Sequence, residues 1–327
     1  MILIIKKNFL NNIKLIFLTC LSIVIYWYFF DITQRIFPDM DQKISNLSRY
    51  KIWYTTYDLN TIFEEKKITG DLGYYILTFF LNSLKLKYEI FFFILFNLYL
   101  LLIIKSYYKI TNLNNSLITN ILLIILSIIW MNSLIGAATR QGCALMIIYY
   151  CFFLRSEREQ FTNYLLFFLA LTFHLSIIIF FPILFLKNFM KKNLIFLEII
   201  FYLMLILYVT GLIEIITPNL INILSSIGID LRSLNFQGHY TSGFSLFKLI
   251  AIVVPFVALK LSERSHIFSK KLYSDISIFY LPPAIIGITF SNMAYYDRIL
   301  LYSWSITPIM CFVFVYSFIN LVGREKI

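Results

Sequence analysis

Long apolar runs separated by short polar stretches make up most of the chain. The runs that can each cross a membrane once cover residues 13–30, 89–104, 117–133, 140–154, 194–211, 246–259, 276–290 and 298–320. They are continuous and of helix length, without the ten-residue alternation of a transmembrane β-barrel. The pattern therefore predicts an all-α fold, a polytopic integral membrane helical bundle.

Residues 161–186 form a further apolar run, which has basic clusters at both ends. If it crossed once, the lysines at 187, 191 and 192 would lie outside, against the positive-inside rule. Two short half-helices that meet near Phe173-His174 satisfy the rule, and one long tilted helix is the alternative. With the half-helices, we expect about ten membrane crossings and cytoplasmic N- and C-termini.

Two polar segments and one short helix lie between these crossings. Residues 31–72 and 212–245 are expected to form external segments. Residues 73–84 are apolar but too short for a crossing, which needs ~20 residues, so we expect a re-entrant or interfacial helix. The pair Pro282-Pro283 is expected to break the helical hydrogen-bond ladder of its run. With no soluble domain or repeat evident, residues 1–327 are predicted to form a single polytopic membrane domain.

Composition excludes a water-soluble particle. Hydrophobic residues make up 60% of the chain and charged residues only 14%. The net charge of +11 comes from short Lys and Arg clusters between apolar runs. The positive-inside rule and contact with anionic membrane lipids explain these clusters better than nucleic acid does. The four cysteines lie in apolar stretches without metal-ligand spacing, so neither a disulfide, a metal nor another cofactor is expected.

Ionisable side chains gather in the outer half of the predicted bundle. They are Arg140, His174, Arg232, His239 and Arg298. Lipid offers no hydrogen bond or counter-charge to an arginine or a histidine, so Arg140 and His174 need an aqueous cavity or an anionic partner. Three arginines and two histidines suit a polyanion, above all phosphate or pyrophosphate, because guanidinium forks onto phosphate oxygens.

Position strengthens this interpretation for two of the arginines. Arg140 and Arg298 are each expected at the outer N-terminus of a helix, where free N–H groups favour an anion. Gln141, beside Arg140, is polar where its helix enters the membrane, and Tyr302 lies one turn after Arg298, so both are expected to contact the substrate. His174 can act as a general base or contact phosphate, since imidazole titrates near neutral pH.

Simpler interpretations stay open for each of these residues. Arg140 can be an interfacial arginine that snorkels to headgroups, and Arg298 can mark the membrane boundary. His174 can be a neutral core histidine bonded to a backbone carbonyl. Arg232 and His239 can be ordinary residues of a solvated loop. The GxSxG, HExxH, Walker A and GxGxxG motifs are all absent, so any transfer reaction must use a donor already activated on a lipid.

Two motifs resemble the signatures of a known family. Residues 139–144 read Thr-Arg-Gln-Gly-Cys-Ala, and residues 169–176 read Leu-Ala-Leu-Thr-Phe-His-Leu-Ser. They resemble the RQ-x-x-A and LA-x-x-FH-x-S signatures of EpsG-like, Wzy-type O-antigen (polysaccharide) polymerases. The outer 39–50 region, the Asp71-Leu72-Gly73-Tyr74 start of the short helix, and Arg298 with Tyr302 also resemble that family's layout. One departure is Gly142-Cys143, where bulkier aliphatic residues are commoner.

This resemblance implies a membrane glycosyltransferase. It would join polyprenyl-pyrophosphate-linked oligosaccharide repeat units at the outer, periplasmic face of the bacterial cytoplasmic (inner) membrane and so extend O-antigen, capsule or exopolysaccharide. Arg140 and Arg298 would bind the donor pyrophosphate, and His174 would position the acceptor hydroxyl or accept its proton. Arg232, His239 and the outer acidic loop with Asp41 would contact sugars. A chain-length regulator and a flippase are the implied protein partners.

Four other classes of membrane protein compete with a polymerase. An O-antigen ligase uses the same donor and differs only in its acceptor. A lipid-linked oligosaccharide flippase needs a cavity open to both faces, whereas the cationic residues here gather on one side. A membrane acyltransferase usually has a histidine near its first span, and a secondary transporter usually has paired repeats; the sequence shows neither.

Overall fold

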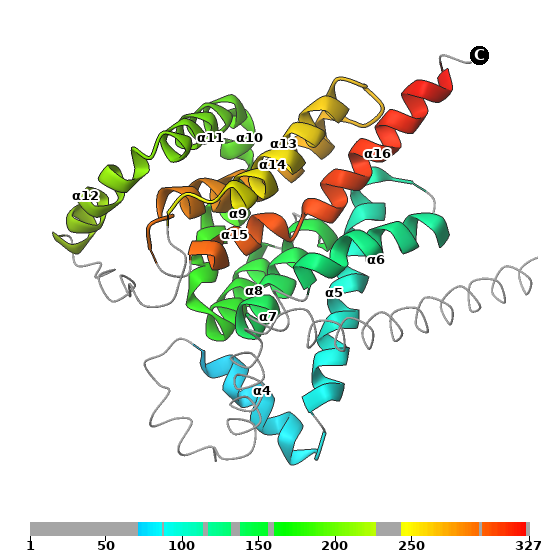
Figure 1. Ribbon diagram of the computed structural model, residues 1–327. Helices are drawn as coiled ribbons and strands as arrows, with labels where there is room; N and C mark the ends of the chain where they lie inside the picture. The colour runs from blue at the N-terminus through cyan, green and yellow to red at the C-terminus, as the bar shows by residue number, and fades with distance from the viewer. Residues whose placement is uncertain are drawn as a thin grey trace, which may run out of the picture. The chain divides into compact units, whose positions relative to one another are not determined.

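The computed structural model describes residues 71–86, 88–113, 117–131, 138–155, 160–226, 243–293 and 296–324. In these ranges every regular element is a helix, which confirms the predicted all-α fold (Figure 1). The predicted first crossing, most of the external segment 31–72, and the residues Asp41, Arg232 and His239 lie outside the described ranges. The chain divides into two compact units, Met1–Leu175 and Ser176–Ile327. The predicted single membrane domain therefore stays a prediction.

The first unit contains the helices that come before His174. They are α4 (Leu72–Ser83), α5 (Tyr88–Thr111), α6 (Leu117–Met131), α7 (Thr139–Tyr149) with its π-helical continuation η2 (Tyr150–Leu154), and α8 (Gln160–Phe173). Helix α7 packs against α8 and α5, and α4 packs against α8. Tyr99 of α5 and Tyr149 of α7 meet edge to face in the core, with ring centroids 6.2 Å apart. Aromatic packing therefore fixes α7 within this unit.

The N-terminal end of α4 lies very close to the C-terminal end of α8. A Cβ atom added at Gly73 would overlap Oγ1 of Thr172 and would lie 3.2 Å from Cδ2 of Phe173. Only glycine leaves room for this approach. The predicted short helix over residues 73–84 is thus confirmed as a helix, and its contact with α8 brings the start of α4 beside His174.

The second unit is built around α14. Its elements are η3 (Leu175–Ile179, whose first residue closes the first unit), α9 (Phe180–Phe185), α10 (Lys187–Lys192), α11 (Leu194–Val209), α12 (Ile213–Ser226), α13 (Leu246–Glu263), α14 (Lys270–Thr289), α15 (Tyr296–Trp304) and α16 (Thr307–Arg324). Helices α11, α13 and α15 all pack against α14. Side chains from Ile276 to Ala284 are buried. Helix α14 is therefore the core helix of this unit.

Pro282-Pro283 interrupts the hydrogen-bond ladder of α14 but does not end the helix, which runs through both prolines. Proline removes two hydrogen-bond donors from the ladder, but its fixed φ is itself compatible with a helix. Packing in the core stabilises the helix in spite of this loss, because both prolines are buried. Ser303 of α15 also donates a hydrogen bond of 3.0 Å to the carbonyl of Tyr280, two residues before Pro282.

Three described helical stretches are long and apolar enough to cross a membrane. They are Phe93–Thr111, Lys270–Thr289 and Tyr296–Asn320. Helices α11 and α12 make a fourth if they count as one span, although they are bent by 115°. Helix α12 also shows that the expected external segment 212–245 begins with an apolar helix. The predicted ten crossings are not confirmed, because the other apolar helices are shorter than a crossing requires.

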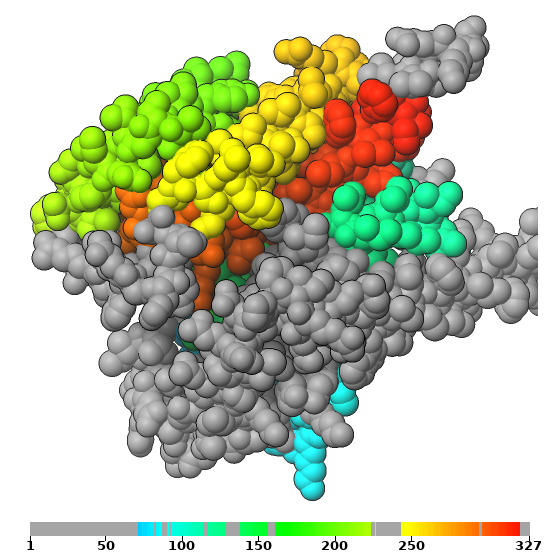
Figure 2. All heavy atoms as spheres, in the orientation of Figure 1, coloured from blue at the N-terminus to red at the C-terminus, as the bar shows by residue number. Residues whose placement is uncertain are grey.

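Helices α11, α12 and α13 lie at the surface in Figure 2, and all three expose large apolar side chains. Examples are Ile195, Phe196, Ile215 and Phe247, each at least 63% exposed. Soluble proteins rarely expose so many large apolar side chains, whereas lipid covers them without cost. The surface supports a membrane protein.

The apolar run 161–186 is not one continuous α-helix. Helix α8 ends at Phe173, His174 is non-helical, and a 3-10 turn follows. The predicted interruption near Phe173-His174 is thus confirmed.

The lysines after this run form ion pairs. The ammonium groups of Lys187 and Lys191 lie 3.2 and 2.7 Å from Oδ1 of the buried Asp275. The membrane side on which these lysines lie stays a prediction.

Gly287 on α14 provides a test of this packing. Its added Cβ would lie 2.5 Å from Cδ2 and 2.8 Å from Cγ of Leu300 on α15. We expect Gly287→Ala to lower the free energy of unfolding by about 1–3 kcal/mol, the usual effect of overpacking. Thermal unfolding of the purified protein in detergent measures the loss.

A double-mutant cycle controls this experiment. In a Leu300→Ala background the added methyl group has room, so Gly287→Ala should cost much less there. Equal losses in the two backgrounds would contradict the close contact between α14 and α15.

Candidate active site

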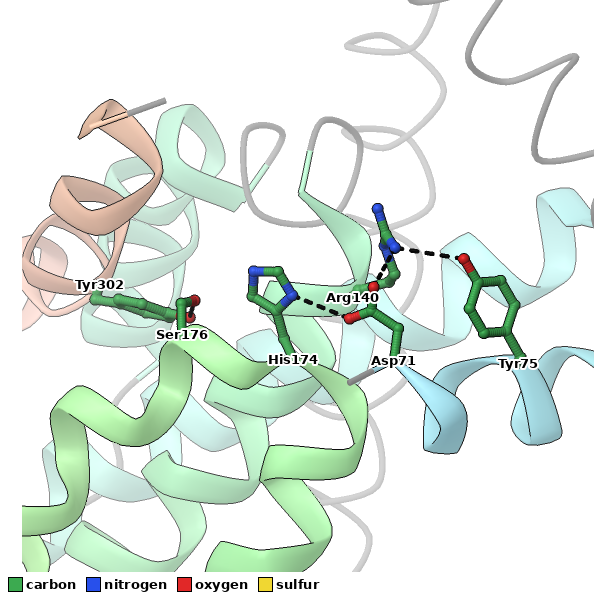
Figure 3. Close-up of polar contacts among 6 residues, drawn as sticks. All are labelled: Asp71, Tyr75, Arg140, His174, Ser176 and Tyr302. Carbon is green, nitrogen blue, oxygen red and sulfur yellow. Dashed lines mark hydrogen bonds and ion pairs between the residues drawn. The ribbon is translucent and has the colours of Figure 1, made fainter. Parts of the chain in front are cut away.

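A single carboxylate joins the two residues that the sequence singles out. Oδ2 of Asp71 accepts a hydrogen bond and ion pair from Nη1 of Arg140, and Oδ1 lies 3.2 Å from Nδ1 of His174 (Figure 3). Asp71 and His174 are 103 positions apart in the chain. All three residues belong to the first unit. The fold therefore brings Arg140 and His174 together as predicted, through a third residue.

Asp71 lies directly before α4, at the position that begins the helix. Its carbonyl accepts hydrogen bonds from the backbone N–H groups of Tyr74 and Tyr75, at 3.1 and 3.2 Å. Its side chain is only 10% exposed. A carboxylate so far removed from water needs charged partners. Arg140 and His174 are those partners.

Arg140 is the second residue of α7, so it stands at a helix N-terminus as predicted. Its Nη1 also lies 3.4 Å from the hydroxyl of Tyr75, one turn into α4. The neighbouring Gln141 and Gly142 are buried in the helix packing. The small and polar residues beside Arg140 thus allow α7 to start deep in the unit, while about a quarter of the Arg140 side chain stays exposed.

His174 occupies the interruption after α8. Its backbone N–H donates to the carbonyl of Ala170 at 3.1 Å, which closes the last turn of the helix. The side chain is 24% exposed. Figure 3 shows Nδ1 facing Asp71 and the other ring nitrogen, Nε2, on the opposite side of the ring. Within the described ranges Nε2 has no hydrogen-bond partner.

This arrangement combines two chemical capacities. A carboxylate on Nδ1 with Nε2 turned away is the arrangement with which an imidazole takes a proton from a hydroxyl. A partly exposed guanidinium next to it can bind phosphate oxygens. Within the described part of the chain, no group of three or more His, Cys, Asp or Glu side chains is placed to hold a metal ion.

The remaining predicted site residues are placed as follows. Arg298 is the third residue of α15 in the second unit, and its backbone N–H lies 3.1 Å from Oδ1 of Asp297. Tyr302 is fully buried on the same helix, with its hydroxyl 2.6 Å from that of Ser176 and its ring against Phe180. These contacts give Tyr302 a packing role. Its predicted contact with substrate stays a prediction, as do those of Asp41, Arg232 and His239.

Sequence reasoning missed Asp71 as a site residue. It lies at the end of a polar segment that contains many acids, so its charge alone does not distinguish it. The available signal was its position directly before a short helix that begins Leu72-Gly73, because a glycine there permits close helix packing. The long-range contact with His174 is a property of the fold, which the local pattern does not encode.

Comparison with known proteins gives a family. No curated protein and no solved structure matches the chain. The model of the EpsG family matches residues 45–325, which include Asp71, Arg140 and His174. The chain therefore belongs to the EpsG family and is a polysaccharide polymerase-like membrane protein.

Proposed function

We propose that this protein is a membrane glycosyltransferase that polymerises polyprenyl-pyrophosphate-linked oligosaccharide repeat units at the outer face of the bacterial cytoplasmic membrane. The observation that carries the proposal is the contact of Asp71 with both Arg140 and His174. It supports the proposal because a guanidinium can bind phosphate oxygens and an imidazole can accept a proton, and transfer from a pyrophosphate donor to a sugar hydroxyl requires both capacities.

In the proposed reaction, a hydroxyl oxygen of the acceptor glycan attacks the anomeric carbon of the donor repeat unit. The bond between that carbon and the phosphate oxygen breaks, and polyprenyl pyrophosphate leaves with the electron pair. Nε2 of His174 takes the proton of the attacking hydroxyl. The reaction needs no nucleotide, because the donor carries its own leaving group.

Arg140 would contact the pyrophosphate as negative charge grows on it. Guanidinium suits this role because it stays protonated and presents several N–H groups in one plane. One of its nitrogens, Nη1, already contacts Asp71 and Tyr75, which fixes the plane of the group. A guanidinium held before the donor arrives loses little conformational entropy on binding.

The wider assignment includes the other predicted contacts. Arg298 would be a second ligand of the pyrophosphate, and Asp41, Arg232 and His239 would contact sugars. Membrane lipids surround the protein, and a flippase and a chain-length regulator would work with it. An O-antigen ligase, a flippase and an acyltransferase are the alternatives, and the glycan profile of a deletion strain separates each of them from a polymerase.

The surface glycan of a strain that lacks the protein tests the proposed function. We expect glycans with a single repeat unit, because units are still made and exported but not joined. Glycan length is measured by gel electrophoresis of the extracted polysaccharide. A strain with no repeat units at all would indicate a flippase or ligase, and normal length with altered substitution would indicate an acyltransferase.

Complementation locates the activity in the site. Plasmids that encode Arg140→Ala or His174→Ala should fail to restore long chains although the variants reach the membrane at wild-type level. Arg264→Ala and His266→Ala, in the exposed turn after α13, are matched controls and should restore them. Wild-type chain length with either site variant would contradict the assignment.

A purified system separates the roles proposed for His174 and Arg140. With a synthetic lipid-linked repeat unit as substrate, His174→Ala should lower kcat by about 10²–10⁴-fold, the usual contribution of a general base. Arg140→Lys keeps the charge but loses the planar fork, so it should retain measurable activity at a reduced kcat/KM. The rate of polyprenyl pyrophosphate release measures both, and full activity of Arg140→Lys would exclude a forked contact.

A further inference from the structure

Asp71 divides its two oxygens between a cation and an imidazole. We propose that Asp71 is a positioning residue that holds the proton of neutral His174 on Nδ1, so that Nε2 is the atom that receives the proton of the acceptor hydroxyl. This inference rests on the proposed function, because it says how the base of that reaction is prepared.

The hydrogen-bonding capacity of each group decides which nitrogen of His174 carries the proton. An ionised carboxylate only accepts hydrogen bonds, whereas neutral imidazole has one N–H and one acceptor nitrogen. Oδ1 of Asp71 lies 3.2 Å from Nδ1 of His174. The bond therefore forms only if Nδ1 carries the hydrogen. Nε2 is then left with the lone pair, on the side of the ring turned away from Asp71 (Figure 3).

The second oxygen of Asp71 fixes the carboxylate itself. Its ion pair with Arg140 prevents rotation about the Cβ–Cγ bond, so Oδ1 stays directed at the histidine. At 10% exposure the side chain has little access to water that could replace either partner. With both oxygens engaged, Asp71 is poorly placed to take a proton from substrate itself. It acts through His174.

The backbone also holds Asp71 in place. The two backbone hydrogen bonds to its carbonyl tie it to the first turn of α4. Gly73 lets this turn approach Thr172 and Phe173, the two residues that precede His174. The distance from Asp71 to the imidazole thus depends on a contact between α4 and α8 that any larger side chain at position 73 would widen.

The test is nitrogen NMR of protein with isotope-labelled histidine, at a pH well above the range in which histidine titrates. The chain has three histidines, and the His174 signals are those that disappear in His174→Gln. We expect wild-type His174 to be protonated on Nδ1. In Asp71→Asn the amide can donate a hydrogen bond to Nδ1, so the population of His174 should move to the Nε2-protonated tautomer. We expect kcat to fall by up to about 10²-fold and KM to stay nearly unchanged.

Further variants separate positioning from simple loss of stability. Asp71→Asn with Arg140→Gln removes both charges of the pair, which restores charge balance but should leave the tautomer wrong. Asp275→Asn, which also removes a buried carboxylate paired with cations, should keep the wild-type His174 signals. Gly73→Ala keeps every polar group and should still weaken the Nδ1 preference, because it moves Asp71 away.

Two results would overturn the inference. One is wild-type His174 protonated on Nε2; the other is Asp71→Asn with the tautomer unchanged. The NMR result does not depend on the reaction. If Asp71→Asn changes the tautomer while the deletion strain makes full-length glycan, the positioning role stands and the proposed function fails.

Discussion

One buried carboxylate organises the site. Asp71 is held between a guanidinium from α7 and an imidazole at the end of α8, and it lies directly before α4. A buried carboxylate without partners is costly, and the same holds for an arginine or a histidine in apolar surroundings. Asp71 therefore stabilises both basic side chains, and each of them stabilises the carboxylate. Because each of these groups would be costly to bury alone, their pairing favours the convergence of three separate helices at this point.

The packing of the first unit supports this convergence. Gly73 permits the close approach of α4 to α8, and aromatic contacts between α5 and α7 fix the helix that carries Arg140. The chain interruption at His174 frees the imidazole from the regular helix surface. The site thus depends on features that look unremarkable one at a time: a glycine, a helix end and a helix start.

The sequence predicted a large part of this. Continuous apolar runs predicted an all-helical membrane protein, and the cost of charge in apolar sequence singled out Arg140 and His174, which the fold brings together. Basic clusters around residues 161–186 predicted the interruption at His174. These inferences succeed because hydropathy and charge act locally, along the chain itself.

The rest depends on tertiary contacts. Asp71 is one acid among many in its polar segment, and only its distant partners distinguish it. The proline pair in α14 did not break its helix, because burial outweighs the two lost hydrogen bonds. The sequence pattern did not predict the burial of Tyr302 against Phe180 either, because an aromatic residue near the start of a helix is equally typical of an interfacial aromatic belt.

The central claim is that Asp71 and His174 act as one unit in glycosyl transfer. The most direct measurement is a double-mutant cycle on kcat with Asp71→Asn, His174→Gln and the double variant. If the carboxylate acts only through the imidazole, the double variant is no slower than His174→Gln alone. Losses that multiply in the double variant would contradict the account.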